Sequence, residues 1–249
     1  MALMPPLDPA SVGIGQDVLA ANAHALGLEL SGRQLAAFAT YERELLDWNA
    51  RVNLTSIDDP TDVQIKHFAD SLAVLGVLPP GGLRLLDVGA GAGFPGVPIK
   101  LVRPEIDLTL LDATGKKTAF LSHLVGALGL ERVQVLTGRA EELGQRPDER
   151  EAYDVVVARA VASLRVLAEL CLPLARIGGM AIAQKKAGVD DELHEAGRAI
   201  SILGGRLRPI VRYRLPGLAD ERWLVVIEKA RPTPRPYPRR PGLPAKSPL

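Results

Sequence analysis

The stretch from residue 83 to residue 96 constrains the fold of this chain more than any other. It starts with an apolar run, Leu83–Val88, and ends in a loop with the sequence Gly-Ala-Gly-Ala-Gly-Phe-Pro-Gly. An apolar run of this length beside glycines is typical of a buried strand. The glycines at 89, 91 and 93 allow a sharp turn and a close approach of backbone to a ligand. Because a helical stretch, residues 96–102, follows, the pattern predicts the ligand-binding crevice of a doubly wound α/β sheet.

Two details of this loop indicate which kind of ligand it holds. Its spacing is G-x-G-x-G rather than the G-x-G-x-x-G of dinucleotide-binding proteins, and Pro95 removes one backbone donor from the start of the helix. Since a pyrophosphate needs those donors, a dinucleotide is the weaker interpretation. Asp87, at the end of the strand, is expected to face the crevice and to suit a ligand with a cationic or amino end.

A second carboxylate lies at the end of the next predicted strand. Asp112 follows the apolar run 106–111 and comes 19 residues after Gly93. A carboxylate at this strand tip is placed to accept hydrogen bonds from both hydroxyls of a ribose. An adenosine with an amino-acid tail and a cationic centre is S-adenosylmethionine, which we therefore predict as the cofactor. A glycine turn and a solvent-facing aspartate in some other α/β enzyme is the alternative that these residues leave open.

Several motifs spread along the chain resemble a single family. They are Leu86–Gly96, Trp48–Thr55, His67–Leu72, Gly138–Glu141, Ala158–Ala162 and Tyr237–Gly242. Together they resemble the RsmG (GidB) family of bacterial small-subunit ribosomal RNA methyltransferases, over nearly the whole chain beyond about residue 30. The resemblance implies transfer of a methyl group to N7 of one guanine, at position 527 of 16S rRNA in the 530 loop. It also implies 16S rRNA as the partner, within the small ribosomal subunit or an assembly intermediate.

Strands alternate with helices beyond residue 83, which predicts a parallel sheet. The predicted strands are 83–88, 107–112, 132–136, 153–158, 178–184, 205–215 and 222–229, the last two forming a hairpin at the edge. The predicted helices between them are 96–102, 116–128, 140–145, 161–175 and 189–204. The predicted fold class is therefore α/β, with seven strands in a mostly parallel sheet. This pattern matches the Rossmann-like class I S-adenosylmethionine-dependent methyltransferases.

The chain is expected to divide into three parts. Residues 1–80 form a small N-terminal helical cap, residues 81–230 the methyltransferase domain, and residues 231–249 a tail. The cap should contain helices at 16–27, 32–48 and 62–76, and residues 1–15 should be poorly ordered. Capping boxes are expected at Ser31–Gln34 and at Thr61–Gln64, ahead of the two longer helices.

The tail has an unusual composition. It holds seven prolines, and residues 229–249 contain six basic residues and no acidic one. So much proline is expected to forbid helix and sheet and to favour an extended polyproline conformation. The positive charge suggests an arm that contacts RNA phosphates, and a loose or surface-packed tail is the alternative.

The strand ends and the resemblance together nominate the site residues. The candidate cofactor-binding residues are Asp87, Gly89, Gly91, Phe94, Asp112, Ala113, Thr114, Ala140, Glu141 and Arg159. The candidate RNA-binding residues are Arg139, Lys185, Lys186, Arg239 and Arg240. An arginine that ends a buried strand needs an anion. For Arg159 that anion is the cofactor carboxylate or an RNA phosphate, with a structural ion pair as the alternative.

Methylation of guanine N7 sets modest chemical demands. N7 carries no proton, so no general base is needed, and the enzyme must chiefly place N7 in line with the sulfonium methyl. We therefore predict no catalytic acid–base pair and consider Arg139, Lys185 and Arg222 as positioning residues only. His67 is expected to be a surface histidine. No metal is expected, because no His, Cys or Asp cluster has metal-ligand spacing.

Composition narrows the remaining alternatives. The single cysteine, Cys171, excludes an internal disulfide, and no apolar run is long enough to span a membrane. With no secretory signal at the N-terminus, a cytoplasmic protein is expected. A methyltransferase acting on another RNA, a protein or a small molecule remains possible from the residues alone, as does a nicotinamide-dependent dehydrogenase.

Overall fold

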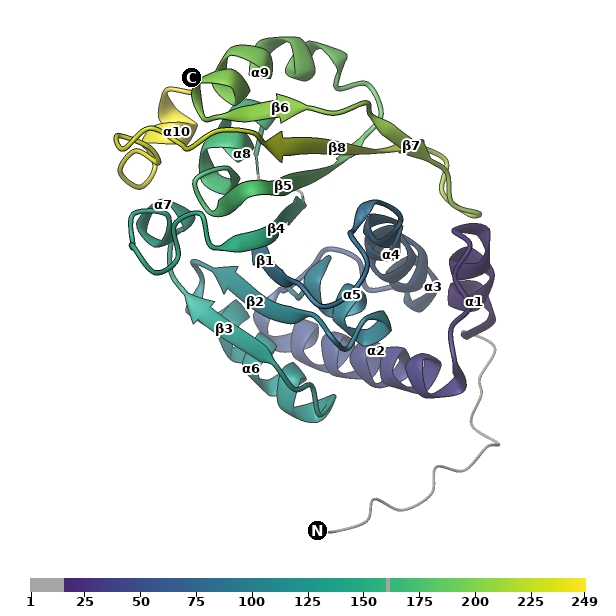
Figure 1. Ribbon diagram of the computed structural model, residues 1–249. Coiled ribbons are helices and arrows are strands. Elements are labelled where there is room, and N and C mark those ends of the chain that lie inside the picture. The colour runs from purple at the N-terminus through teal and green to yellow at the C-terminus, as the bar shows by residue number, and fades with distance from the viewer. Residues whose placement is uncertain (1–15, 160–161) are drawn as a thin grey trace.

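One mixed sheet organises the protein in the computed structural model, which describes residues 16–159 and 162–249 (Figure 1). The strand order is β3-β2-β1-β4-β5-β8-β6, and β7 also pairs with β8. Strands β1 to β5 run parallel to one another, whereas β8 pairs antiparallel with β5, β6 and β7. The strands are β1 (Arg84–Val88), β2 (Asp107–Asp112), β3 (Val133–Thr137), β4 (Tyr153–Arg159), β5 (Ala175–Lys186), β6 (Gly205–Leu207), β7 (Val211–Tyr213) and β8 (Arg222–Lys229).

The sheet has eight strands where seven were predicted. The single strand expected at 205–215 is divided into β6 and β7, which pair with opposite ends of β8. Pro209 lies in the interruption, where it cannot donate a ladder hydrogen bond. The edge of the sheet is therefore broken at the proline, while the mostly parallel Rossmann-like architecture was predicted correctly.

Successive side chains of each strand point to opposite faces of the sheet, so the hydrophobic core is divided into two clusters. Leu85, Val157 and Ile182 pack on one side of the sheet, and Leu86, Val156 and Ala183 pack on the other. Figure 1 shows the helices in two layers, one on each face. One layer holds α2 (Gly32–Val52), α5 (Gly96–Val102) and α6 (Gly115–Ala127), and the other holds α7 (Ala140–Leu143), α8 (Leu164–Cys171) and α9 (Asp190–Ile202).

The N-terminal helices pack on the first of these faces. After α1 (Gln16–Ala25) and α2, a helical segment comprises α3 (Pro60–Asp62), the π-helical turn η2 (Val63–Ala69), α4 (Asp70–Leu72) and the 3₁₀ turn η3 (Ala73–Val77). Phe38 and Phe68 are completely or almost completely buried and share one cluster with strand residues of the sheet. The division into cap and domain at residue 80 stays a prediction.

One of the two predicted capping boxes is present. The Ser31 hydroxyl accepts a hydrogen bond from the Gln34 amide, and the Gln34 side chain returns one to the Ser31 amide. The second box was placed wrongly. The Asp59 carboxylate caps the helix by accepting from the Asp62 amide, because Pro60 takes the first helical position, where no N–H is needed.

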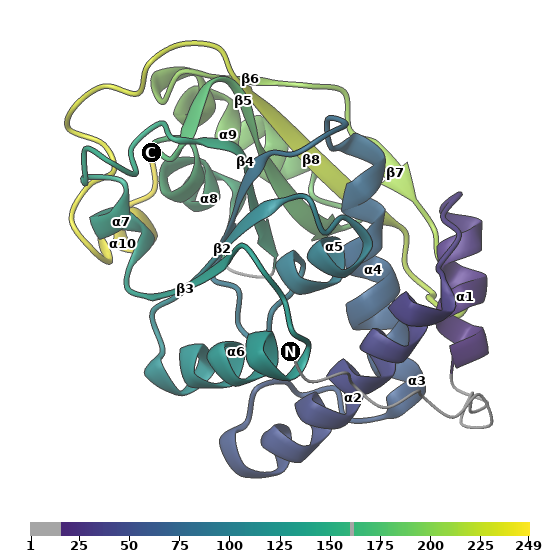
Figure 2. The same cartoon turned by 60° about the horizontal axis from the view of Figure 1, so that its bottom comes forward.

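The C-terminal segment is packed against the domain. Figure 2 shows it running beside α7 and α8, and its last turn is the short helix α10 (Leu243–Lys246). The expectation that proline forbids helix here was therefore wrong, since Pro244 lies in the first helical turn, where it is tolerated. The Arg150 guanidinium donates to the carbonyl oxygens of Thr233 and Tyr237 at 2.8 and 2.7 Å. A side chain on Gly144 would collide with Pro238.

The remaining boundaries differ by a few residues. The helix predicted at 161–175 is observed as α8, Leu164–Cys171, and the strand predicted at 178–184 extends to Ala175–Lys186. Residues 1–15, expected to be poorly ordered, lie outside the described residues, as do residues 160 and 161 of the Ala158–Ala162 motif. Within the described part of the chain, no helix has the length and hydropathy to cross a membrane.

Candidate functional site

A cavity of about 440 Å³ opens at the carboxyl ends of β1, β2 and β4, where the strand order reverses. A cavity of this size is within the usual range for small-molecule sites. Eight of the ten candidate cofactor residues line it, namely Gly89, Gly91, Phe94, Asp112, Ala113, Ala140, Glu141 and Arg159. Asp87 and Thr114 do not.

The three glycines of the loop have two different roles. Gly89 and Gly91 line the cavity with φ values of 73° and 60°, which a larger residue rarely adopts. Gly93 was expected to approach the ligand too, but it faces the N-terminal helices. A Cβ on Gly93 would lie 2.5 Å from the Tyr41 hydroxyl, which donates to the carbonyl oxygen of Ala92. Gly93 is therefore required by the packing of α2 against the loop.

The start of α5 offers no free backbone amide to a phosphate. The Gly96 amide donates to the Asp87 carboxylate at 2.8 Å, and the Val97 amide donates to the Gly93 carbonyl oxygen. Pro98 has no N–H. A pyrophosphate would need the donors that these contacts occupy, so the geometry argues against a dinucleotide.

Asp87 is buried beneath the loop and does not line the cavity as expected. Its side chain is fully buried, with Oδ2 accepting from the Gly96 amide and Oδ1 without a hydrogen-bond partner among the described residues. Burial raises the pKa of this carboxyl to about 7, although the Gly96 amide opposes the rise. Asp87 therefore contacts the loop from beneath. Because it does not line the cavity, the geometry does not support its predicted contact with an amino group of the ligand.

The Asp87→Asn substitution is expected to weaken the pH dependence of stability. An acid whose pKa is raised in the folded state stabilises the fold below about pH 4, and this contribution is lost as pH rises to about 7. Between pH 5 and pH 8 the loss amounts to about 2–3 kcal/mol. Urea unfolding at both pH values should show a smaller difference for the variant than for the wild type. If the free energy of unfolding changed equally between the two pH values in the variant and in the wild type, Asp87 would not be buried in its protonated form.

Asp112 connects the two loops that border the cavity. Its Oδ2 accepts from the Gly91 amide at 2.9 Å and its Oδ1 accepts from the Thr114 amide at 2.8 Å. Each carboxylate oxygen retains a second lone pair for a ligand. Thr114 itself is exposed at the N-cap position of α6, where its side chain makes no capping hydrogen bond, and the cavity lining does not support its predicted cofactor contact.

One lining residue of the cavity, Glu141, contacts the C-terminal segment. Glu141 is buried, and its Oε1 accepts from the Gly242 amide at 2.9 Å. Arg139 lies 3.4 Å from the same oxygen, with about half of its side chain exposed. The segment that was expected to be an RNA-binding arm therefore touches a wall of the cavity.

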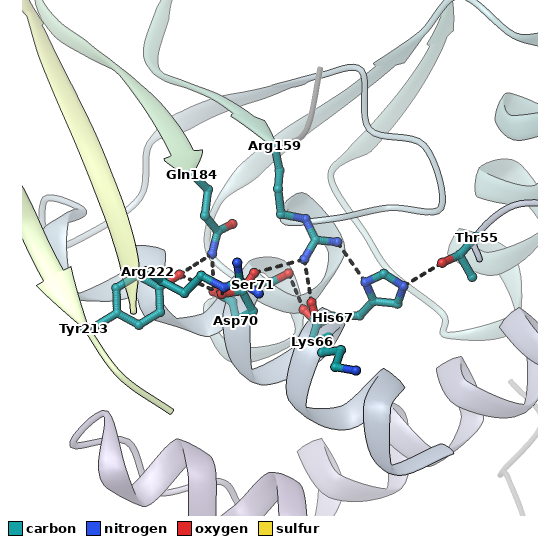
Figure 3. Close-up of polar contacts among 9 residues, drawn as sticks. All are labelled: Thr55, Lys66, His67, Asp70, Ser71, Arg159, Gln184, Tyr213 and Arg222. Atoms are coloured by element: carbon teal, nitrogen blue, oxygen red, sulfur yellow. Dashed lines mark hydrogen bonds and ion pairs between the residues drawn. The ribbon is translucent and has the colours of Figure 1, made fainter. Parts of the chain in front are cut away.

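Arg159 meets an anion, as a buried arginine should, and that anion belongs to the protein. Its guanidinium donates to the Lys66 carbonyl oxygen at 3.0 Å and lies 3.4 Å from the Asp70 carboxylate (Figure 3). It also donates to Nδ1 of His67 at 3.2 Å and lies over the Phe94 ring. The structural ion pair that was the alternative for Arg159 is thus present, and two of its five N–H groups remain free of these contacts.

His67 is buried, contrary to the expectation of a surface histidine. Because an arginine can only donate, Nδ1 of His67 must be the acceptor in the contact with Arg159, and Nε2 then carries the proton. Nε2 donates to the Thr55 hydroxyl at 2.8 Å. Burial, and secondly the charge of Arg159, lower the pKa of this imidazole to about 3. His67 is therefore a neutral, fully engaged ring that stacks on Phe94.

Comparisons with known proteins identify the family. A family model described as rRNA small subunit methyltransferase G matches residues 34–216. The ribosomal RNA small subunit methyltransferase G of Dehalococcoides mccartyi is 49% identical over 225 residues, which cover 90% of this chain and 96% of that protein. The chain belongs to the methyltransferase G family. The Staphylococcus epidermidis member is 48% identical over 224 residues, covering 90% and 93% of the two chains.

Solved structures support the fold of this methyltransferase. A SAM-dependent methyltransferase from Aquifex aeolicus superposes with a TM-score of 0.52 at 19% identity, covering 70% of this chain and 96% of that one. The YcgJ protein of Bacillus subtilis gives the same TM-score at 15% identity, covering 65% and 98%. The protein is a Rossmann-like class I methyltransferase, and its cofactor is S-adenosylmethionine.

The basic residues predicted to contact RNA differ in their surroundings. Lys186 is largely exposed, whereas Lys185 donates to the Glu192 carboxylate at 2.9 Å and to the Ala162 carbonyl oxygen. Arg240 is exposed. The guanidinium of Arg239 makes a bidentate pair with the buried Glu169 at 2.6 to 3.1 Å, so its predicted contact with RNA has no support from this geometry and stays a prediction.

Most of the polar residues that the N-terminal helices and the strand ends bring together were not predicted from the sequence. Figure 3 shows Asp70 between Arg159 and Arg222, with its Oδ1 accepting from the Tyr213 hydroxyl at 2.8 Å. Lys117, Gln184 and Tyr213 had no assigned role, and Thr55 and Asp70 were expected to be turn or capping groups. The alternation of β4, β5 and β8 places Arg159, Gln184 and Arg222 on one face, and only this periodicity signalled the cluster.

In the described ranges, no group of three or more His, Cys, Asp or Glu residues is arranged to hold a metal ion.

Proposed function

We propose that this protein transfers the methyl group of S-adenosylmethionine to N7 of guanine 527 in the 530 loop of 16S rRNA. The substrate is the RNA within the small ribosomal subunit or an assembly intermediate. Family membership supports 16S rRNA methylation, and the chemistry of the site supports N7 as the acceptor atom.

The observation that carries the proposal is the state of His67. Methylation of an amine or a hydroxyl needs a base to take the departing proton, whereas N7 has a free lone pair. The imidazole beside the cofactor cavity has no lone pair available, because Arg159 occupies Nδ1 and Nε2 is protonated. The Asp112 carboxylate accepts from two backbone amides, and we assign its remaining lone pairs to the ribose of the cofactor. A site of this kind suits an acceptor that loses no proton.

The single-turnover rate is expected to be independent of pH from about pH 6 to pH 9. No proton is removed, and His67, with a pKa of about 3, keeps its charge state in this range, while Asp87, whose pKa is about 7, does not line the cavity. Rapid-quench measurement with saturating RNA and cofactor checks this. A steep rise of the rate with pH that His67→Ala abolishes would reveal a general base and exclude the assignment.

The cofactor contacts also belong to the proposal. Gly89, Gly91 and Phe94 surround the amino-acid end, Asp112 and Ala113 hold the ribose, and Ala140 and Glu141 face the adenine. Arg139, Lys186 and Arg240, which are all exposed, contact RNA phosphates.

A transfer assay separates the proposed function from its alternatives. The purified protein and tritiated S-adenosylmethionine are mixed with separate fractions of cells that lack the gene. The fractions are total RNA, ribosomal subunits, cellular protein and a small-molecule extract. We expect label in the 16S rRNA alone. Label in another RNA, a protein or a small molecule would replace the proposal with that substrate class.

A further inference from the structure

A second cavity, of about 800 Å³, adjoins the cofactor cavity. His67 and Arg159 line both, so these two side chains form the boundary between them. The wall beyond that boundary is polar and includes Asp70, Gln184 and Arg222. A nucleotide in the second cavity would lie next to the methyl donor, with Arg159 beside both.

Gln184 presents an unused hydrogen-bond acceptor in this wall. Its side-chain nitrogen donates to the Tyr213 hydroxyl at 2.7 Å and to the carbonyl oxygen of Asp70, which fixes the orientation of the amide. The amide oxygen is buried and has no partner among the described residues. Figure 3 shows this oxygen pointing toward the side on which Arg159 lies. A buried acceptor of this kind costs free energy unless a ligand occupies it.

Arg222 presents an unused donor in the same wall. Its Nε is buried without a hydrogen bond in the described chain, and the nearest carboxylate oxygen, Oδ1 of Asp70, is 3.6 Å away. The other residues with such atoms, which are Asn22, Gln64, Asp87 and Arg165, do not line this cavity.

The strand register orders these groups by their distance from the cofactor. Arg159 pairs with Gln184 across β4 and β5, and Arg222 pairs with Lys186 across β5 and β8, one position further along the same face. The sheet therefore presents a donor, an acceptor and a donor in a row that leads away from the cofactor cavity. Arg159 is the first donor. Three of its five N–H groups contact the N-terminal helices, and the other two are available to a ligand.

We propose that the second cavity binds the target guanine and that Gln184 distinguishes it from other bases. With N7 toward the methyl group, the next atom of guanine is the acceptor O6, and the donors N1–H and N2–H₂ follow. Arg159 donates to O6, and the Gln184 oxygen accepts from N1–H and N2–H₂. Adenine presents a donor where guanine has O6, so it would meet Arg159 with the wrong polarity. Arg222 supplies positive charge that holds the rest of the nucleotide. The inference rests on the proposed function.

Inosine tests this assignment, because it keeps O6, N1–H and N7 of guanine but lacks the 2-amino group. Small subunits are reconstituted with 16S rRNA that carries guanosine or inosine at the target position, and kcat/KM for methyl transfer is measured. The wild type should prefer guanosine about tenfold, the scale for losing one net hydrogen bond. Gln184→Ala should lower kcat/KM on guanosine at least tenfold and nearly abolish the preference. Gln184→Met keeps the side-chain volume but lacks the hydrogen-bond acceptor, so it should show the same losses as Gln184→Ala. Titration calorimetry of cofactor binding reports whether each variant is folded.

Two matched controls lie outside both cavities. Gln64 is a buried glutamine whose oxygen also lacks a partner, and Arg165 is an arginine whose buried Nε lacks one. Gln64→Ala should keep the wild-type preference for guanosine. Arg222→Ala should raise KM for the subunit at least tenfold without changing that preference, and Arg165→Ala should not.

The outcomes separate the inference from the function it rests on. If the wild type methylates guanosine and Gln184→Ala and Gln184→Met keep both its rate and its preference, the assignment of the second cavity is overturned and the proposed function stands. If the wild type methylates no guanosine in these subunits, both are overturned.

Discussion

Replacing Glu169 by alanine is expected to lower the free energy of unfolding by about 3–5 kcal/mol, the usual cost of removing one partner from a buried ion pair. The Glu169 side chain is 1% exposed, and it accepts from the backbone and the guanidinium of Arg239. Its removal leaves the Arg239 charge partly buried and unpaired and releases the C-terminal segment from α8. Urea unfolding of the purified protein measures the loss.

Arg240 provides the matched control for this ion pair. It is adjacent in sequence and exposed, so Arg240→Ala should change stability by less than about 0.5 kcal/mol. If Arg240 contacts a phosphate, its substitution should reduce the salt dependence of RNA binding by about one counterion. Equal stability losses in Arg239→Ala and Arg240→Ala would contradict the docked tail, and a slope reduced by Arg239→Ala alone would restore Arg239 as an RNA contact.

The Asp112→Ala substitution is expected to weaken S-adenosylmethionine binding by about 2–3 kcal/mol. This is the scale for losing hydrogen bonds to a charged group. In addition to the proposed ribose contact, the variant loses the acceptor for the Gly91 and Thr114 amides, so both loops beside the cavity are loosened. Titration calorimetry gives the affinity, and an unchanged value would exclude Asp112 as the ribose ligand.

Asp107 is a suitable control at the other end of the same strand. Its carboxylate pairs with Arg132 at 2.5 Å, both side chains are about half exposed, and neither lines the cofactor cavity. Asp107→Ala should leave the cofactor affinity unchanged. A comparable loss in this variant would show that disturbing β2 anywhere weakens the cofactor, and Asp112 would lose its special role.

Local signals in the sequence were sufficient for most of the fold. The apolar runs of β1, β2 and β4 are each followed by a turn or end in a charged residue, and the Ser31–Gln34 capping box marks the start of α2. These features involve residues that are close together in the sequence, so they can be read from the sequence alone. The position of Asp112 after the second strand likewise identified one side of the cofactor cavity.

Contacts between distant parts of the chain could not be predicted in this way. Gly93 was attributed to ligand binding, but its space is required by Tyr41, which lies 52 positions earlier in the sequence. Arg239 was assigned to RNA because nothing local shows that Glu169 neutralises it. The polar row of Arg159, Gln184 and Arg222 depends on the pairing of three strands, and composition carries no trace of that register.

Mapping of 7-methylguanosine in 16S rRNA tests the central claim most directly. Borohydride reduction followed by aniline cleaves RNA at this nucleotide, and the fragments show its position. In cells that lack the gene, cleavage at guanine 527 should disappear, and adding the purified protein and S-adenosylmethionine to their small subunits should restore it. Cleavage that persists without the gene, or a methyl group restored at another atom or nucleotide, would contradict the account.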